Sequence, residues 1–210
     1  MPKVKAAGHA IGFIVKYTAD FFRTPRKLAT KSPRALAAPP SRRALPTARP
    51  RLDPAVGQRI KAMPEGSRPD PSTYLSKADI DQHLKPFRES GAVRVANEDN
   101  IARRGTVGPA GGTFVMPRSQ FDALRARCGG NLGQMETELG LESESLTRGT
   151  SVAVYIEPDC LRELRMPSGN EAGANALWEP GGYTSGGMAE ATVNTPVDVP
   201  FTIMDLLEES

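Results

Sequence analysis

Apolar residues recur at helical spacing along residues 77 to 90, with polar or charged residues between them. The apolar positions are Ile80, Leu84 and Phe87. They fall on one face of a 3.6-residue period. Ser76 is a favourable N-cap residue, and Gly91 is favourable just past a helix end. The pattern therefore predicts a helix over residues 77 to 90.

Short apolar runs elsewhere predict strands. In residues 92 to 96, Val93 and Val95 point to one face and Arg94 to the other, as the two-residue period of a strand requires. Residues 152 to 156 form the most apolar run. The other predicted strands cover residues 113 to 116, 188 to 193 and 201 to 204.

Two more helices are predicted between glycine boundaries. Pro117 and Ser119 open the first, and Gly129 with Gly130 closes it. Its inward-facing residues are Phe121, Ala123 and Leu124. The second helix covers residues 132 to 139 and ends at Gly140. Short strands, several helices and long glycine-rich loops together predict an α+β fold.

The first third of the chain differs in composition from the rest. Residues 1 to 70 carry 15 Lys and Arg against 4 Asp and Glu, whereas residues 71 to 210 carry 12 against 20. The prolines of residues 24 to 71 are too closely spaced for a helix or a sheet. The composition predicts a basic, disordered arm over residues 1 to 70 and a folded domain over residues 71 to 210, with order beginning near Ser72.

Charge and hydropathy exclude some classes of function. The acidic balance of residues 71 to 210 argues against nucleic-acid binding. No run of 18 apolar residues is present, so no transmembrane helix is expected. Near the N-terminus, apolar residues at helical spacing lie among basic ones: Ala10, Ile14, Tyr17 and Phe21. Such a segment is typical of a secretion signal, a chaperone-binding helix or a membrane-surface helix.

Cysteine and histidine are too sparse to predict a metal site. Cys128 and Cys160 form no Cys-x-x-Cys pair, which favours free thiols in a reducing cytosol. His9 falls in the basic arm, and His83 falls in the first predicted helix. A catalytic triad in the folded part would therefore depend on His83 alone.

The glycine-rich stretch of residues 164 to 190 is the strongest candidate for a ligand-binding region. A dense cluster of glycines indicates turns, or a backbone that approaches a ligand closely. Residues 181 to 187, GGYTSGG, place hydroxyl groups between two Gly-Gly turns. Glu190 follows at the junction with a predicted strand. A surface hairpin with a solvated Glu190 is the alternative interpretation.

Several short motifs follow one another in order over residues 90 to 205. They are GTVGP from Gly105, GGTFVMP from Gly111, LGL from Leu139, RMPSGNEAGAN from Arg165, Trp178, PGGYTSGG from Pro180, and Glu190. The pattern resembles a family of C-terminal toxin domains found in bacterial polymorphic toxins and stand-alone secreted effectors. The resemblance implies kinship with ADP-ribosyltransferases and with the necrotizing-toxin type of NAD glycohydrolase. It also implies a fold of small twisted sheets with flanking helices.

The resemblance implies an NAD site built on an arginine and a carboxylate. A carboxylate stabilises the oxocarbenium-like state at the nicotinamide ribose, and an arginine fork binds phosphate through two charge-assisted hydrogen bonds. Arg94 is implied as the diphosphate or ribose anchor, and Glu190 as the catalytic carboxylate. Glu171 is a competing catalytic carboxylate, although in a turn it could equally hold the loop together.

Other residues of the same motifs are implied to contact NAD. They are Gly112, Thr113, Phe114, Tyr183, Thr184 and Ser185, with Trp178 as a further stacking candidate. Each has a structural alternative, since aromatic rings fill cores and hydroxyls occupy ordinary turns. Arg94 could equally be the solvent side of its strand. Three arginines compete with it for phosphate: Arg103, Arg104 and Arg118.

The resemblance thus implies a secreted bacterial effector that acts in the target-cell cytoplasm, with NAD as its substrate and without a metal. It would transfer ADP-ribose to a target-cell protein. One stand-alone effector family of similar layout modifies a threonine of host ubiquitin, whose basic surface would suit an acidic domain. The alternatives are an NAD glycohydrolase and a non-enzymatic binding module. A secretion chaperone or an immunity protein is a further implied partner.

Overall fold

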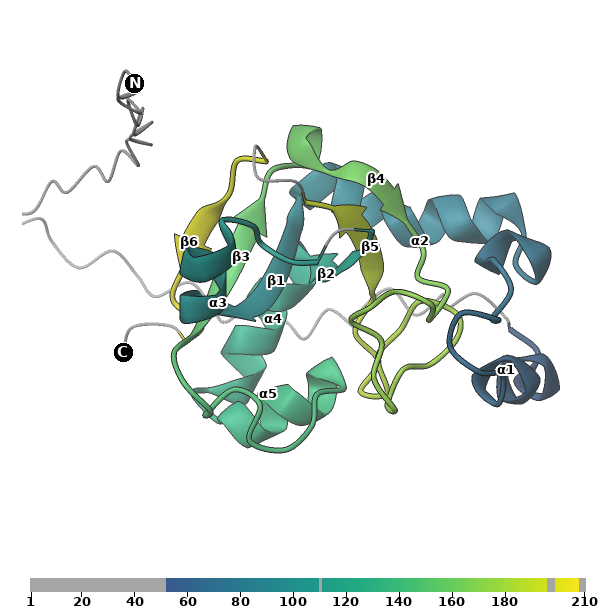
Figure 1. Cartoon of the computed structure of the whole chain (residues 1–210), viewed down its shortest axis with the longest axis horizontal. Coiled ribbons are helices and arrows are strands. Elements are labelled where there is room, and N and C mark those ends of the chain that lie inside the picture. Colours follow the sequence, from purple (N-terminus) through teal and green to yellow (C-terminus); the bar gives the residue numbers. More distant parts are fainter. Residues whose placement is uncertain (1–51, 110, 196–198, 208–210) are drawn as a thin grey trace, which may run out of the picture. The chain divides into compact units, whose positions relative to one another are not determined.

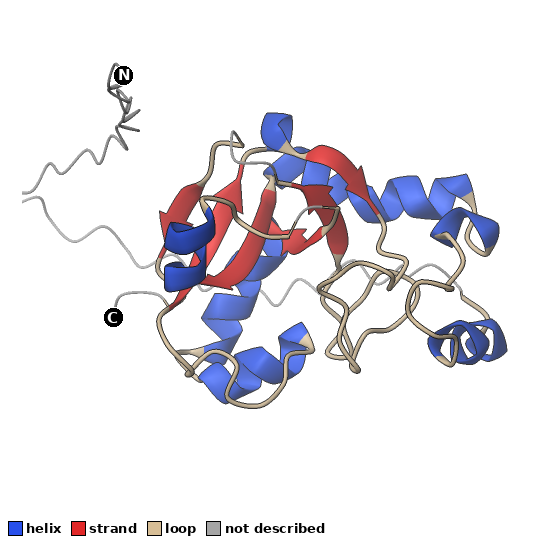
Figure 2. Cartoon of the chain, in the orientation of Figure 1, coloured by secondary structure: helices blue, strands red, loops and turns tan. Residues whose placement is uncertain are grey.

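The computed structural model describes residues 52–109, 111–195 and 199–207, which form an α+β fold around an antiparallel sheet (Figure 1, Figure 2). In these residues the sheet is open and six-stranded, in the order β4-β5-β2-β1-β3-β6. The strands are β1 (Ala92–Asn97), β2 (Thr113–Pro117), β3 (Ser151–Ile156), β4 (Arg162–Arg165), β5 (Ala191–Asn194) and β6 (Thr202–Met204). The predicted α+β class is confirmed.

Helices flank the sheet and precede it in the chain. They are α1 (Pro54–Lys61), α2 (Lys77–Ser90), α3 (Glu98–Arg104), α4 (Arg118–Cys128) and α5 (Leu132–Leu139), with 3-10 turns η1 (Pro71–Thr73) and η2 (Pro158–Cys160). The bounds of α2 and α5 are those predicted from the sequence. In α2 the Ser76 side chain accepts the Asp79 N–H, and the Gly91 N–H donates to the Phe87 carbonyl, so both caps act as expected.

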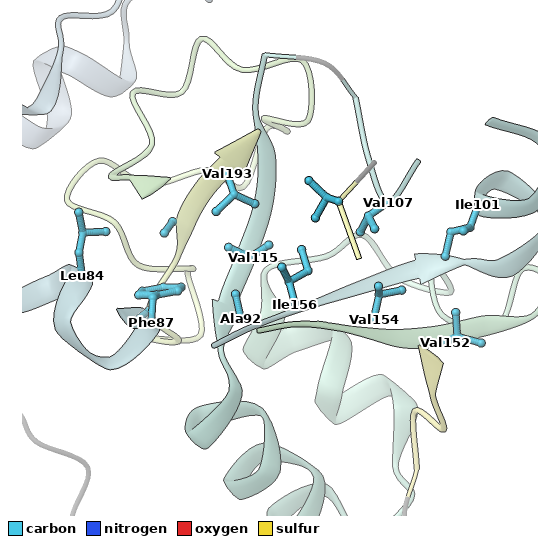
Figure 3. Packing of buried hydrophobic residues seen from close by; sticks show 13 residues of the cluster. Leu84, Phe87, Ala92, Ile101, Val107, Val115, Val152, Val154, Ile156 and Val193 are labelled. Atoms are coloured by element: carbon cyan, nitrogen blue, oxygen red, sulfur yellow. The ribbon is translucent and has the colours of Figure 1, made fainter. Parts of the chain in front are cut away.

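Apolar side chains pack on both faces of the sheet. The α2 core, drawn in Figure 3, includes Leu84, Phe87, Ala92, Ile101, Val107, Val115, Val154 and Val193. The α4/α5 core on the other face includes Val93, Met116, Phe121, Leu124, Met135, Leu139 and Met188. The two-residue period of β1 sends Ala92 and Val93 to opposite cores. The same period places Arg94 on the side of the α2 core.

The strands β1 and β2 are paired over a short length only. Their register joins Ala92 to Pro117 and Val93 to Met116. Beyond these pairs β1 continues beside β3, and β2 continues beside β5. Figure 3 shows the two strands diverging from Ala92. The sheet therefore opens beside Arg94, the residue of β1 that follows the last pair.

The expected start of order near Ser72 is wrong, because residues 52 to 71 are already structured. The Asp53 side chain caps α1 by accepting a backbone N–H at 2.8 Å. Pro54 begins α1 and Pro71 begins η1. A proline is tolerated in a first turn because the N–H it lacks would have no helical partner there. Close spacing of prolines is therefore compatible with order when they fall at helix starts.

The segment that holds α1 packs against the loop of residues 166 to 190 between β4 and β5, hereafter the β4–β5 loop (Figure 1). Arg68 lies over the Trp178 ring, 4.7 Å from its centroid, and donates to the Gly169 carbonyl at 2.5 Å. Lys61 forms an ion pair with Glu179. Gly169 lies 101 residues after Arg68 in the chain, and Glu179 lies 118 residues after Lys61. Local composition does not reveal such contacts.

The sequence pattern does not predict α3 or β4, and the strand predicted over residues 188 to 193 begins before β5 does. α3 has only seven residues, and β4 reads RELR, which carries no apolar alternation. β5 begins at Ala191, and before it Ala189 makes only an isolated bridge with Tyr183. Short or polar elements depend on their neighbours rather than on their own pattern.

The amphipathic segment expected near the N-terminus lies outside the described residues. The division of the chain into an arm and a domain stays a prediction, and α1 shows that structure begins well before residue 71. None of the helices in the described ranges is long and apolar enough to cross a membrane.

Candidate functional site

Glu190 lies where the β4–β5 loop enters β5, and two bonds hold its own backbone while a third holds that of Ala189. The Glu190 N–H donates to the Gly182 carbonyl at 2.8 Å. His83 Nε2, from α2, donates to the Glu190 carbonyl at 2.7 Å. From α4, Gln120 Oε1 accepts the Ala189 N–H at 2.9 Å. These bonds fix the direction in which the Glu190 side chain leaves the backbone.

The Glu190 carboxylate has no hydrogen-bond partner within the described part of the chain. Burial raises the pKa of Glu190 to about 7, and the nearby charge of Glu171 acts in the same direction. The group is therefore partly protonated at neutral pH. A carboxyl group with such a displaced pKa beside a cleft is a candidate for acid-base or electrostatic catalysis.

The Glu190 carboxylate borders a cleft made of two adjoining hollows. Both hollows are lined by Phe114, Leu139, Leu141, Gly173, Thr184 and Glu190. One extends to Trp178, and the other extends to Arg94 and Met188. We call the combined space the Glu190 cleft. Apolar walls with a few polar groups are typical of sites for organic ligands.

Arg94 and Glu190 both line the cleft, but their charges are not paired. Burial, together with the like charge of Arg104, lowers the pKa of Arg94 to about 10. The charge that acts on Glu190 is that of Glu171. The guanidinium of Arg94 lies against the turn before β2. It is so close to Gly108 that a Cβ there would lie 2.4 Å from Arg94 Nη1. Arg94 thus lines the cleft and also contacts the turn before β2.

Glu171 is engaged in holding the β4–β5 loop. Its Oε1 accepts the Ser168 N–H at 3.1 Å and the Ser168 hydroxyl at 3.2 Å, and its Oε2 accepts the Gly169 N–H at 2.8 Å. Glu171 is buried, and a Cβ on Gly112 would lie 2.7 Å from its Cγ. Gly112 therefore permits the loop to pack against β2. This geometry favours the loop-holding interpretation of Glu171 over the catalytic one.

The remaining candidates divide between the cleft and the structural framework. Phe114 presents a partly exposed ring to the cleft. Thr184 lines the cleft too, but its hydroxyl donates to the Glu138 carbonyl at 2.6 Å and so ties the loop to α5. Ser185 is exposed and does not line either hollow.

Two predicted NAD contacts point away from the cleft. The Thr113 hydroxyl is fully buried and bonds the Thr195 hydroxyl at 2.7 Å. The Tyr183 ring packs edge-on against His83, with 5.0 Å between centroids. Both residues therefore support the sheet and its packing on α2. The direction of a side chain in an irregular loop depends on contacts that its own motif does not encode.

The competing arginines differ in their surroundings. Arg118 is occupied by Asp122, with both carboxylate oxygens 2.9 Å from its Nε. Arg103 donates to the Asn100 side chain. Arg104 shares a hollow with Arg94. Among the described residues, no three His, Cys, Asp or Glu side chains gather as metal ligands.

Several residues of the site could not be assigned from the sequence. His83 and Gln120 hold the backbone around Glu190, and both lie on helices far from it in the chain. Leu139 and Leu141 belong to a matched motif, yet apolar residues next to a helix end carry no signal of a ligand wall. Gly173 belongs to the motif RMPSGNEAGAN, and a glycine there likewise does not indicate whether it lines a ligand site or only forms a turn.

A comparison with models of known protein families gives no match for this chain, and a comparison with curated proteins gives none either. The resemblance to NAD-consuming toxins therefore depends on the short motifs alone.

Proposed function

We propose that the chain is a secreted bacterial effector that cleaves NAD and transfers ADP-ribose to a protein of the target cell. The observation that carries the proposal is that Glu190 has a fixed backbone and a carboxylate that faces a cleft. Its backbone is fixed by bonds to Gly182 and His83, while its carboxylate borders a partly apolar cleft without an internal hydrogen-bond partner. A carboxylate held in this way is available to a ligand.

In the proposed reaction the bond between nicotinamide and the ribose C1′ breaks, and nicotinamide leaves with the bonding electrons. The ionised Glu190 carboxylate stabilises the positive charge that develops on the ribose. Phe114 offers an aromatic face for the nicotinamide ring. An acceptor hydroxyl then bonds to C1′ and releases its proton to water. Arg94, at the far edge of the cleft, is placed to bind a phosphate of NAD.

The proposed acceptor is a protein with a basic surface, and the argument for it is charge complementarity. Residues 71 to 210 carry an excess of acidic side chains, and a basic protein surface such as that of ubiquitin would complement them. Transfer to water instead of a protein would make the chain a glycohydrolase.

The test incubates the full-length protein with NAD labelled on its adenosine, with and without ubiquitin and target-cell lysate. Nicotinamide release and label on a protein band support transfer. Nicotinamide release with all label in free ADP-ribose supports the glycohydrolase instead. Absence of nicotinamide release under all conditions contradicts the proposal. A Glu190→Gln protein serves as the inactive control, and Glu179→Gln, on the same loop but paired with Lys61, serves as the matched active one.

A further inference from the structure

A second hollow adjoins Arg94 and is bordered by the end of β1, by α3 and by the turn before β2. Its polar lining residues are Arg94, Asn97, Asn100, Arg104 and Thr106. Ile101 and Val107, which also line it, belong to the α2 core. No acidic side chain is among its described lining residues. We call this space the Arg94–Arg104 pocket.

Two guanidinium groups therefore face one pocket without a carboxylate between them. Arg104 acts on Arg94 as a like charge and lowers the Arg94 pKa, in addition to burial. Arg94 Nε is buried and has no hydrogen-bond partner among the described residues. A buried donor without a partner, next to a second positive charge, is unfavourable unless an anion offsets it.

Local structure explains why the two arginines meet. α3 ends at Gly105, whose φ of 66° reverses the chain directly after Arg104. The following turn reaches Gly108, where a side chain would collide with Arg94 Nη1. Asn97 caps α3 by accepting the Asn100 N–H at 3.1 Å, which holds α3 against the end of β1. The turn thus encloses the guanidinium of Arg94 and places Arg104 at the rim.

We propose that the Arg94–Arg104 pocket binds a phosphate-type oxyanion between the two guanidinium groups. Arginine forks match the geometry of phosphate oxygens and donate two hydrogen bonds at once. Arg94 supplies a buried donor, and the exposed Arg104 closes over the anion from the surface. Amide and hydroxyl groups of Asn100 and Thr106 complete a polar wall. The pocket shares Arg94 with the proposed NAD site and in that respect rests on the proposed function, but phosphate binding does not require NAD cleavage, since a protein that does not cleave NAD would still bind phosphate.

The test titrates inorganic phosphate into the full-length protein at constant ionic strength and follows Arg Nε–Hε resonances by NMR. The Arg94 Hε resonance should move downfield as it acquires an acceptor. Arg104→Gln should weaken phosphate binding about tenfold or more, because hydrogen bonds to charged groups are among the strong ones. Arg104 is exposed, so this variant should keep the fold.

Arg88→Gln is the matched control, since Arg88 is an exposed helical arginine on α2 and does not line the pocket. It should change phosphate affinity less than about twofold, the weak effect of a screened surface charge. Equal weakening by both variants, or an Arg94 resonance that does not respond to saturating phosphate, would overturn the proposal. NAD that displaces phosphate identifies a nucleotide phosphate as the occupant, and NAD that binds together with phosphate identifies a free anion; both support the site.

Discussion

Glu190 titrates near neutrality because burial and the charge of Glu171 both disfavour its ionised form. The proposed chemistry needs the ionised form. We therefore expect NAD cleavage to rise as the pH increases through about 7 and to level off above about 8. Nicotinamide release at saturating NAD, measured from about pH 5.5 to 9, checks this. A rate that falls over this range would point to an acid role instead.

The same residue should limit stability. The pKa of Glu190 is about 7 in the folded chain against an ordinary value of 4.5, so folding disfavours its ionisation. Its stabilising contribution is complete below about pH 4.5 and is lost as the pH rises through 7. Glu190→Gln should therefore raise the free energy of unfolding by up to about 3 kcal/mol near pH 8, and by little near pH 4. Urea unfolding of both proteins at the two pH values measures this. A variant less stable at pH 8 would contradict it.

At the scale of elements, the β4–β5 loop depends on Glu171. Glu171→Gln removes one of the two oxygens that accept the Ser168 and Gly169 N–H groups. We expect it to lower the free energy of unfolding by about 1–3 kcal/mol. It should also lower the pKa of Glu190, since the nearby charge is lost, and move the midpoint of the rate profile to lower pH.

Glu163→Gln is the control for this change, because Glu163 is exposed on β4 and outside the loop. It should leave stability and the pH midpoint as they are. Loss of turnover in Glu171→Gln without loss of stability would instead make Glu171 the catalytic carboxylate.

The elements differ in how far the sequence predicts them. α2 and α5 carry their own caps and apolar faces, so their bounds follow from local pattern. The segment that holds α1 contacts the β4–β5 loop through pairs distant in the chain, such as Arg68 with Trp178, which a local pattern does not predict. In the site, the order of the motifs predicts Glu190 and Phe114 as ligand contacts, and both line the cleft. It does not show that Thr113 and Tyr183 turn toward the core, because packing partners elsewhere in the chain decide that.

At the scale of the whole molecule, the segment before α2 is a support for the loop that carries Glu190. A chain that starts at Ser72 lacks α1 and the Arg68 contacts with Trp178 and Gly169. We expect it to melt several degrees lower than the full chain, since a loss of about 1 kcal/mol lowers Tm by about 2–8 °C. Calorimetry measures Tm. A chain that starts at Pro46 keeps the segment and is the control. Equal Tm for all three chains would show that the segment contributes nothing.

In the proposed function, the Glu190 carboxylate acts on the transition state of NAD cleavage. The most direct measurement compares turnover and NAD affinity for the full-length parent, Glu190→Gln and Glu179→Gln. Glutamine keeps the size of the side chain and removes its charge, so NAD affinity should change less than about threefold while turnover falls by about 10²–10⁴. Glu179→Gln should match the parent in both. Glu190→Gln that releases nicotinamide at the parental rate would contradict the account.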